Sequence, residues 1–397
     1  MAITFPDDLD DDVDYALDDL PDLDARLADL RSRKPAAWVR CFGEKAVLFT
    51  SYELVHGAFK DEATFPSAEF YGNVVTDVMG RNIQCMEGQE HKINRALVSP
   101  GFRQRLMPGI IGPLLEPVAH ELIDRFEGRG HAELVSEFTH RYPAKVILAM
   151  LGLPQTDEDD VTRWAIGMLD IQRGHEQAIQ CAREFERYVQ PHLDERRRNP
   201  GDDLLSKLAV EEVDGTRLTD SEIFAFLKLL FPAGADTTYL GLGNTIFGLL
   251  THPTERAKLV ADPAGRAASA AEEGLRWNPP VPLLPRRNRA DVVWHGIAIP
   301  AGTHLLFGIG AANRDPAVFD DPDRFDIDRV IPTSLTFGFG THFCLGVHLA
   351  RAEMAIALRV IFERPPRLRL VDGAEVRITG AFIQLLRGPN QLPVRFD

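Results

Sequence analysis

The sequence lacks the features of an exported, disulfide-bonded or membrane-spanning protein. Its four cysteines (Cys41, Cys85, Cys181 and Cys344) are widely scattered and form no Cys-x-x-Cys pair, which argues against a disulfide framework. The N-terminus has no basic stretch followed by an apolar one, so no signal peptide is expected. No run of about 18 apolar residues is available to cross a membrane. We therefore expect a soluble, cytoplasmic protein.

Positive charge is also scarce. Lysine and arginine number 44 against 59 aspartates and glutamates, a net charge of −15, which argues against nucleic acid as a partner. Much of the acid lies between Pro6 and Leu30, and we expect residues 1–30 to form an exposed, solvated segment. No repeat, Ser/Gly-rich linker or low-complexity tract interrupts the chain. We expect one domain over residues 1–397 and a monomer.

The N-terminal part of the chain predicts a hairpin, a helix and a loop. Strand-like runs over 37–42 and 46–50 are separated by Gly43-Glu44-Lys45, which predicts a hairpin. Ser51 is expected to cap a short helix that ends near Phe59. Residues 61–86 have weak periodicity and mix prolines, glycines and aromatics, which predicts a long irregular loop.

The middle of the chain is typical of a helical layer. Apolar residues recur at helical spacing over 114–126, 137–151 and 157–198, with almost no strand signals. Short strand-like runs return over 294–306 and 368–396. The pattern as a whole predicts a mostly α-helical fold with a minor β-sheet contributed by the two ends of the chain.

The longest apolar helical run, residues 221–250, contains a proline and a glycine near its middle. Pro232 and the polar residues after it could end one helix and cap another. However, residues on one face stay in phase across the break: Ile223, Leu227, Leu230, Gly234, Thr237 and Gly241. We therefore predict a single kinked helix, since Pro232 removes an N–H donor and a threonine hydroxyl can bond to a preceding carbonyl. The opening, lined by Ala233 and Gly234, would leave room for a small molecule.

Residues 337–346 (Phe-Gly-Phe-Gly-Thr-His-Phe-Cys-Leu-Gly) form a loop that delivers one cysteine to the start of a helix. Gly338 and Gly340 allow the backbone to turn tightly. A cysteine at a helix N-terminus faces unpaired N–H groups, which favours the thiolate. A thiolate in this position is a soft axial ligand for haem iron. The alternatives are an ordinary buried thiol and a catalytic cysteine nucleophile.

This loop resembles the haem-binding loop of the cytochrome P450 family, whose pattern is Phe, two residues, Gly, three residues, Cys, one residue and Gly. Phe337, Gly340, Cys344 and Gly346 occupy its fixed positions. The resemblance extends over almost the whole chain and implies the mostly helical P450 fold with one haem b. Cys344 would ligate the iron, and His342 stands where the family often carries a cation for a haem propionate.

Other expected haem contacts lie far from this loop in sequence. His91 and Arg95 are four residues apart, hence on one face of a helix, and the family places such a pair at the propionates. Two carboxylates at the edge of a buried ligand need cationic partners. Arg286 matches the position of a further propionate-binding arginine. Arg287 and Arg289 lie close enough to remain alternatives.

Residues 233–238 match the family's oxygen-binding motif, Ala/Gly-Gly-x-Asp/Glu-Thr-Thr/Ser, at every position. The resemblance implies that Asp236 and Thr237 form an acid–alcohol pair that relays protons, with the Thr237 hydroxyl facing the oxygen pocket and the carboxylate connected to solvent. The substrate cannot be identified, and the candidate pocket residues indicate only an apolar ligand: Tyr71, Leu229, Ala233, Leu284 and Ile383.

Glu273 and Arg276 stand three residues apart on a helix that must end before Pro279. They match the family's structural Glu-x-x-Arg motif. Its usual third partner is the arginine of a Pro-x-Arg-Phe segment, which here is Arg324. The motif is expected to support the fold and not to take part in the chemistry.

The resemblance implies a haem-thiolate monooxygenase that activates O2 and hydroxylates an apolar small molecule. Electrons would come from a ferredoxin and a ferredoxin reductase, since no Gly-x-Gly-x-x-Gly fingerprint follows a strand. A basic patch for an acidic ferredoxin is a hypothesis, with ordinary solvated helix faces as its alternative: Lys92, Arg103, Arg105, Arg351 and Arg359. Two other functions remain open, namely a peroxide-using or rearranging haem-thiolate enzyme and a non-catalytic haem sensor. Asp236 and Thr237 argue against the first.

Overall fold

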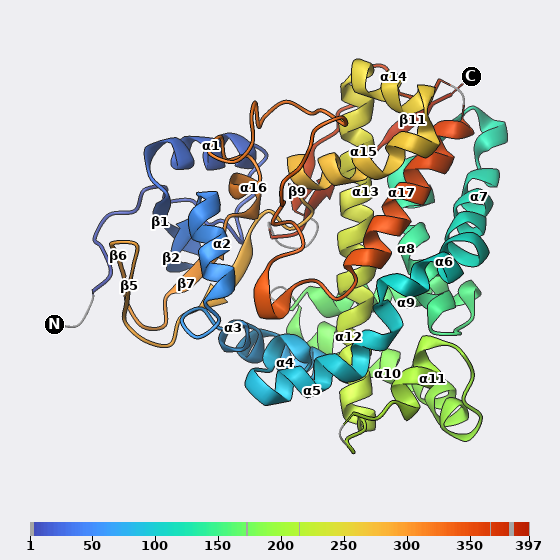
Figure 1. Ribbon diagram of the computed structural model, residues 1–397, viewed down its shortest axis with the longest axis horizontal. Helices are drawn as coiled ribbons and strands as arrows, with labels where there is room; N and C mark the ends of the chain where they lie inside the picture. Colours follow the sequence, from blue (N-terminus) through green and yellow to red (C-terminus); the bar gives the residue numbers. More distant parts are fainter. Residues whose placement is uncertain (1–3, 172–173, 214, 366, 381–384, 397) are drawn as a thin grey trace.

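The computed structural model describes residues 4–171, 174–213, 215–365, 367–380 and 385–396. Most of these residues are helical, and Figure 1 shows the N-terminal strands on one side of the molecule and most of the helices on the other. The prediction of a mostly α-helical fold with a minor sheet is confirmed. No helix within the described ranges has the length and apolar character needed to cross a membrane.

The helices follow one another along the chain with short connections. They are α1 (Leu23–Arg33), α2 (Tyr52–Lys60), α3 (Ser67–Val74), α4 (Thr76–Met79), α5 (Gly88–Val98), α6 (Met107–Ile110), α7 (Glu116–Asp124), α8 (Arg141–Met150), α9 (Glu158–Leu169), α10 (His175–Arg198), α11 (Leu204–Val210), α12 (Asp220–Phe231), α13 (Thr237–Thr251), α14 (Pro253–Ala261), α15 (Pro263–Trp277), α16 (Ile309–Ala312) and α17 (Val347–Glu363).

The strands are shorter than the helices. They are β1 (Ala36–Cys41), β2 (Glu44–Phe49), β3 (His131–Glu133), β4 (Leu284–Arg287), β5 (Val292–Trp294), β6 (Ile297–Ile299), β7 (His304–Phe307), β8 (Arg369–Leu370), β9 (Ile378–Gly380), β10 (Arg387–Pro389) and β11 (Pro393–Arg395). β3 is an exception to the predicted lack of strands in the middle of the chain, because it pairs with the distant β11.

The principal sheet has the order β1-β2-β7-β4 and joins the N-terminal hairpin to a later part of the chain. β1 and β2 are antiparallel, as predicted, and β2 pairs in parallel with β7. The hairpin turn consists of Phe42 and Gly43, with φ values of 54° and 79°, and is one residue shorter than the predicted connection. β4, which ends at Arg287, pairs with β7, so the sheet brings Arg286 close to the N-terminal part of the fold.

The acidic N-terminal segment is more ordered than its composition predicts. Asp14 is buried, and its carboxylate accepts hydrogen bonds from the N–H groups of Ala16 at 2.9 Å and Gly43 at 2.6 Å. Tyr15 is fully buried, and Asp10 pairs with Lys34 at 2.5 Å. The expectation of a solvated segment is therefore wrong for this part, because the carboxylate of Asp14 accepts from N–H groups of the hairpin turn and that of Asp10 accepts from the N–H of Trp38 in β1.

The segment after α2 also differs from expectation. Ser51 caps α2 as predicted, since its hydroxyl accepts the Leu54 N–H at 3.3 Å. Residues 61–86, however, are not a long irregular loop, because they contain α3, α4 and a 3₁₀ turn, Ile83–Cys85. Helices as short as α3 and α4 show little sequence periodicity and depend on tertiary packing for their stability.

α12 and α13 run as one long helix through the molecule, beside α17 (Figure 1). The prediction of a single kinked helix is confirmed, and the break is a π-helical turn over Pro232–Asp236. α13 approaches the C-terminal strands closely, because a Cβ added at Gly243 would lie 2.9 Å from the ring of Pro389. The long helix thus places residues 233–238 in the interior of the molecule.

Candidate active site

A cavity lies between the cysteine loop and the π-helical turn of the long helix. Cys344 lines one part of it, and Ala233 and Thr237 line another. Tyr71 on α3 and Leu284 on β4 also line the cavity. The cavity therefore brings together segments that are remote in sequence, and its walls are mainly apolar.

The cysteine loop, residues 337–346, is held against the end of α2. Gly340 has a φ of 74°, and a Cβ at this position would lie 2.6 Å from the carbonyl oxygen of Phe59, so no larger residue fits without movement. Gly338 also has a positive φ, 69°. The Cys344 N–H donates to the Phe337 carbonyl at 3.0 Å, which closes the turn.

Cys344 carries a free thiol and lies just before the first residue of α17, Val347. Burial raises the pKa of the Cys344 thiol, although a hydrogen bond from the backbone of Gly346 and the positive charge of Arg95 act in the opposite direction. In the protein alone, burial therefore outweighs the helix N-terminus, which was expected to favour the thiolate.

Cationic residues gather at one edge of the cavity. Arg286 is buried, lines the cavity, and lies over the ring of Tyr71 with its guanidinium carbon 5.6 Å from the ring centroid. Arg95 and His342 also line the cavity, and Arg95 donates to the Phe343 carbonyl at 2.5 Å. His91 is buried behind them, with its ring centroid 4.3 Å from that of His342.

The unpaired state of His91 is unusual for a buried side chain. Its Nε2 has no hydrogen-bond partner among the described residues. Burial, His342 and Arg95 lower the pKa of His91 to about 4, so the imidazole is neutral at pH 7. His91 itself does not line the cavity, so the structure does not place this expected haem contact beside Arg95, Arg286 and His342.

The two alternative arginines have partners elsewhere. Arg287 donates to the carbonyl of Gly302 at 2.9 Å. Arg289 forms ion pairs with Glu69 at 2.7 Å and with Glu87 at 2.5 Å. Neither arginine lines the cavity, so the geometry favours Arg286 as the residue that meets an anionic ligand group.

These groups fit a haem. A free thiol lines the cavity, its walls are largely apolar, and Arg95, Arg286 and His342 lie where two carboxylates would need cationic partners. No group of His, Cys, Asp and Glu within the described ranges is arranged to bind a metal ion directly.

Asp236 and Thr237 follow one another at the end of the π-helical turn, but only Thr237 lines the cavity. The Thr237 hydroxyl donates to the Ala233 carbonyl at 2.5 Å. Asp236 is 1% exposed and does not line the cavity, so the expectation that its carboxylate connects to solvent is wrong. Its Oδ2 has no partner among the described residues, and burial raises the pKa of Asp236 to about 8. The acid is therefore mainly protonated at pH 7.

Four of the five candidate substrate residues line the cavity: Tyr71, Leu229, Ala233 and Leu284. Ile383 lies outside the described residues. The cavity is also lined by polar residues that sequence reasoning missed, among them Gln84 and Glu353. Nothing in the sequence around Gln84 indicates its place, whereas Glu353 interrupts the apolar face of α17 and could have been noticed. Burial raises the pKa of Glu353 well above its ordinary value.

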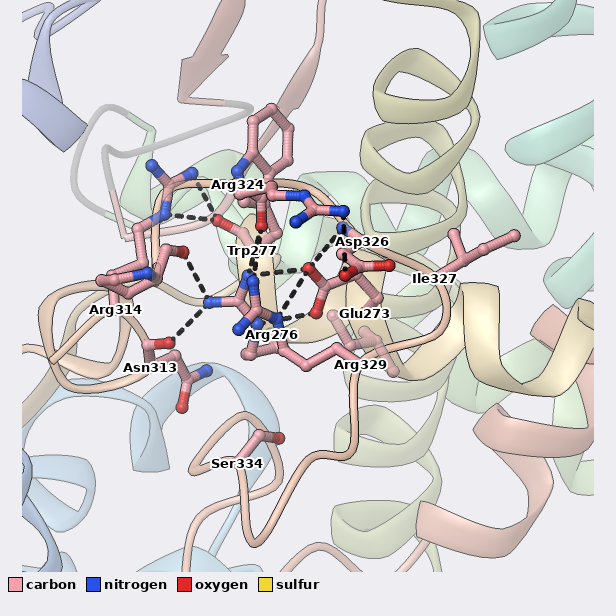
Figure 2. Close-up of polar contacts among 12 residues, drawn as sticks. Glu273, Arg276, Trp277, Asn313, Arg314, Arg324, Asp326, Ile327, Arg329 and Ser334 are labelled. Atoms are coloured by element: carbon pink, nitrogen blue, oxygen red, sulfur yellow. Dashed lines mark hydrogen bonds and ion pairs between the residues drawn. The ribbon is translucent and has the colours of Figure 1, made fainter. Parts of the chain in front are cut away.

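The predicted structural ion pair is present, but its third member differs from expectation (Figure 2). Glu273 and Arg276 are both buried and pair at 2.7 Å. The second cation is Arg329, whose Nε lies 3.3 Å from Glu273. The expected partner, Arg324, contributes its backbone carbonyl to Arg276, while its largely exposed guanidinium pairs with Asp326 at 3.4 Å.

The hypothetical basic patch is smaller than expected. Arg351 pairs with Glu272 at 2.6 Å. Arg359 pairs with Glu116 and, at 3.2 Å, with Glu363. Three exposed cations have no ion pair within the part of the chain that the structure describes: Lys92, Arg103 and Arg105.

Comparisons with known proteins show what this chain is similar to. The family model described as Cytochrome P450 matches residues 268–364, a range that includes Cys344. The chain is 35% identical to 6-deoxyerythronolide B hydroxylase of Saccharopolyspora erythraea over 93% of this chain and 95% of the relative. It is 35% identical to a steroid C26-monooxygenase of Mycolicibacterium smegmatis over 87% of this chain and 86% of the relative.

Solved structures show the same similarity. The polyketide synthase P450 PksS of Bacillus subtilis superposes with a TM-score of 0.89 and 31% identity, covering 95% of this chain and 97% of that one. A P450 of Chondromyces apiculatus superposes with a TM-score of 0.87 and 31% identity, covering 95% of this chain and 96% of that one. At these identities and coverages, the likeness extends over both sequence and fold.

Proposed function

Because this chain belongs to the cytochrome P450 family, it is a haem-dependent monooxygenase, and we propose that it hydroxylates a largely apolar small molecule with electrons from a ferredoxin and a ferredoxin reductase. The observation that carries the proposal is that Cys344 and Thr237 line one and the same mainly apolar cavity. Two relatives are named for 6-deoxyerythronolide B hydroxylation and for steroid C26 oxidation, which supports a small-molecule substrate.

In this proposal Cys344 is the iron ligand, and Arg95, Arg286 and His342 hold the propionates, with His91 behind them. The haem, when bound, supplies the redox-active iron at which dioxygen is activated. The protein's own part is to exclude water and to hold the substrate. Tyr71, on α3, lines the cavity and would contact the substrate.

In the same proposal, Asp236 and Thr237 supply protons to the cavity. The buried carboxyl of Asp236 holds its proton at pH 7 because burial raises its pKa to about 8. The Thr237 hydroxyl is fixed at the cavity wall by the hydrogen bond that it donates to the Ala233 carbonyl. Its oxygen can still accept a hydrogen bond from a second donor. We propose that a proton passes from Asp236 to the cavity through this hydroxyl, after a rearrangement that brings the two side chains together.

Thr237→Ala is expected to uncouple electron use from product formation. The change removes the hydroxyl at the cavity wall but barely alters packing, so substrate binding and NADH oxidation should continue. Positioned proton transfer typically contributes about 10²–10⁴-fold, and product formation should fall by a factor in this range. The measurement is the ratio of product to NADH, with hydrogen peroxide assayed in parallel, using a ligand first found by its Soret shift.

Thr251→Ala is a matched control for that experiment. Its hydroxyl makes the same type of bond, to the Phe247 carbonyl at 2.8 Å, but it lies at the end of α13 and away from the cavity. Its product ratio should equal that of the wild type. An unchanged ratio in Thr237→Ala would show that protons arrive by another route. NADH oxidation that requires no ferredoxin system would contradict the proposed electron source.

The electron donor is proposed to dock at the exposed cations Lys92, Arg103 and Arg105. Electron-transfer complexes are small and electrostatically steered, so the rate of reduction should fall as salt rises. Arg103→Glu should slow reduction at low salt and weaken the salt dependence. Arg359→Gln is the control, since Glu116 and Glu363 already neutralise this arginine and little change is expected. A rate that is flat from low to high ionic strength would require a different docking mode.

We further propose that the chain forms a single domain and works as a monomer in the cytoplasm. All four cysteines are free, in agreement with a reducing compartment. Gel filtration of the haem-loaded protein measures the oligomeric state directly.

A further inference from the structure

One oxygen of Glu62 contacts two parts of the candidate active site at once. Glu62 lies between α2 and α3, and its Oε1 accepts the N–H of Ser67 at 2.8 Å. The same oxygen lies 3.1 Å from Nε2 of His342. Ser67 is the first residue of α3, and His342 is two residues before Cys344. Glu62 therefore joins the helix that covers the cavity to the loop that carries the thiol.

The start of α3 depends on this carboxylate. The N-cap residue of α3 is Pro66, which makes no side-chain capping bond. A helix N-terminus with unpaired N–H groups is stabilised by a nearby acceptor, and most of all by an anion. Glu62 fills this role from outside the helix, in place of the serine, threonine or aspartate that normally stands at the N-cap.

The surroundings of Glu62 favour the ionised form of its carboxylate. Its side chain is 25% exposed and that of His342 is 10% exposed. Burial alone would raise the pKa of Glu62, but hydrogen bonds from His342 and from the Ser67 N–H, with the positive charge of Arg286, lower it overall. At neutral pH a charged carboxylate thus holds both partners, and bonds to a charged acceptor are stronger than neutral ones.

The contact also orients the imidazole of His342. With Nε2 facing Glu62, Nδ1 is the ring nitrogen left to meet a group in the cavity. One turn further along α3, the ring of Tyr71 lies under the guanidinium of Arg286. α3 is thereby connected to two residues that line the cavity, to His342 through Glu62 and to Arg286 through Tyr71.

We propose that Glu62 is a positioning residue that couples haem retention to the order of α3, a proposal that rests on the haem-binding role assigned above to His342. Without the carboxylate, His342 would lose its fixed orientation and the first turn of α3 would lose its acceptor. The contact of His342 with the haem and the first turn of α3 would then both be weakened. The structure thus links the cofactor to the substrate pocket through one side chain.

The test compares variants of the haem-loaded protein by two measurements. The first is the rate of haem transfer to excess apomyoglobin, and the second is amide hydrogen exchange in residues 67–74. Glu62→Ala should release haem about tenfold faster, since a charge-assisted hydrogen bond is lost, and α3 should exchange faster. Glu62→Gln should restore protection of α3, because a neutral oxygen suffices for the Ser67 N–H. It should still release haem severalfold faster than the wild type.

Glu69→Gln is the matched control on the same helix. It removes the ion pair with Arg289, which is not bonded to His342, so haem release should stay within about twofold of the wild type. A Glu62→Ala protein that releases haem at the wild-type rate overturns the coupling. If that variant does not fold, wild-type haem release by Glu62→Gln overturns it instead. Failure of the proposed function is recognised separately, by a wild-type protein that lacks the thiolate spectrum altogether.

Discussion

Replacing Cys344 by serine is expected to abolish the red-shifted Soret band of the reduced carbon monoxide complex and, with it, monooxygenase activity. A serine hydroxyl is a hard, weakly acidic group and cannot replace the soft thiolate that gives this spectrum. Among the described residues Cys344 is the only cysteine that lines the cavity. The spectrum of the purified, haem-reconstituted variant measures the effect directly.

Cys181→Ser is the control for this experiment. Cys181 is a free thiol buried on α10, away from the cavity, and its Sγ lies 3.7 Å from the side-chain nitrogen of Gln177. Its variant should keep the wild-type spectrum. A red-shifted band that persists in Cys344→Ser would mean that another cysteine ligates the iron, and the assignment of the site would be wrong.

Glu273→Gln is expected to destabilise the protein by about 3–5 kcal/mol and to lower the fraction that carries haem. The substitution leaves the buried guanidinium of Arg276 without its counter-ion and also removes the partner of Arg329 (Figure 2). Arg276 is fully buried in α15, the helix that packs against α13 and α17, so the loss reaches the core. Urea unfolding and the ratio of Soret to protein absorbance measure the two effects.

Arg324→Gln tests whether Arg324 belongs to the buried ion-pair network, as the sequence predicts, and we expect it to change the free energy of unfolding very little. The Arg324 guanidinium is 57% exposed and pairs with Asp326, while only its backbone carbonyl contacts Arg276. Surface substitutions of this kind change stability by about 0.5 kcal/mol or less. A large loss in Arg324→Gln, or a Glu273→Gln protein as stable and haem-loaded as the wild type, would contradict the structural account.

Features encoded by neighbouring residues could be predicted from the sequence. The cysteine loop depends on Gly338 and Gly340, whose positive φ values are a local backbone property. The continuity of the long helix was visible as an unbroken phase across Pro232, and the hairpin as two strand-like runs around a turn. Each of these signals lies within a few residues of the structure it produces.

The sequence also determined the family and, with it, the expected iron ligand, because several motifs occur in the family's order. It placed Tyr71, Leu229, Ala233 and Leu284 at a cavity that they do line. The sequence did not predict α3, which is too short to show a clear helical period. It also failed for Asp14, because the acidic composition of its segment predicted exposure to solvent, whereas its carboxylate binds the hairpin turn.

Only the tertiary structure decided which charged groups meet. Glu273 pairs with Arg329, 56 positions away, and not with Arg324. Glu62 bonds to His342, 280 positions away, and Asp236 lies buried instead of facing solvent. A long side chain can reach several partners, and the choice among them depends on how helices and loops pack around it. That packing is a property of the whole chain, so no local pattern records it.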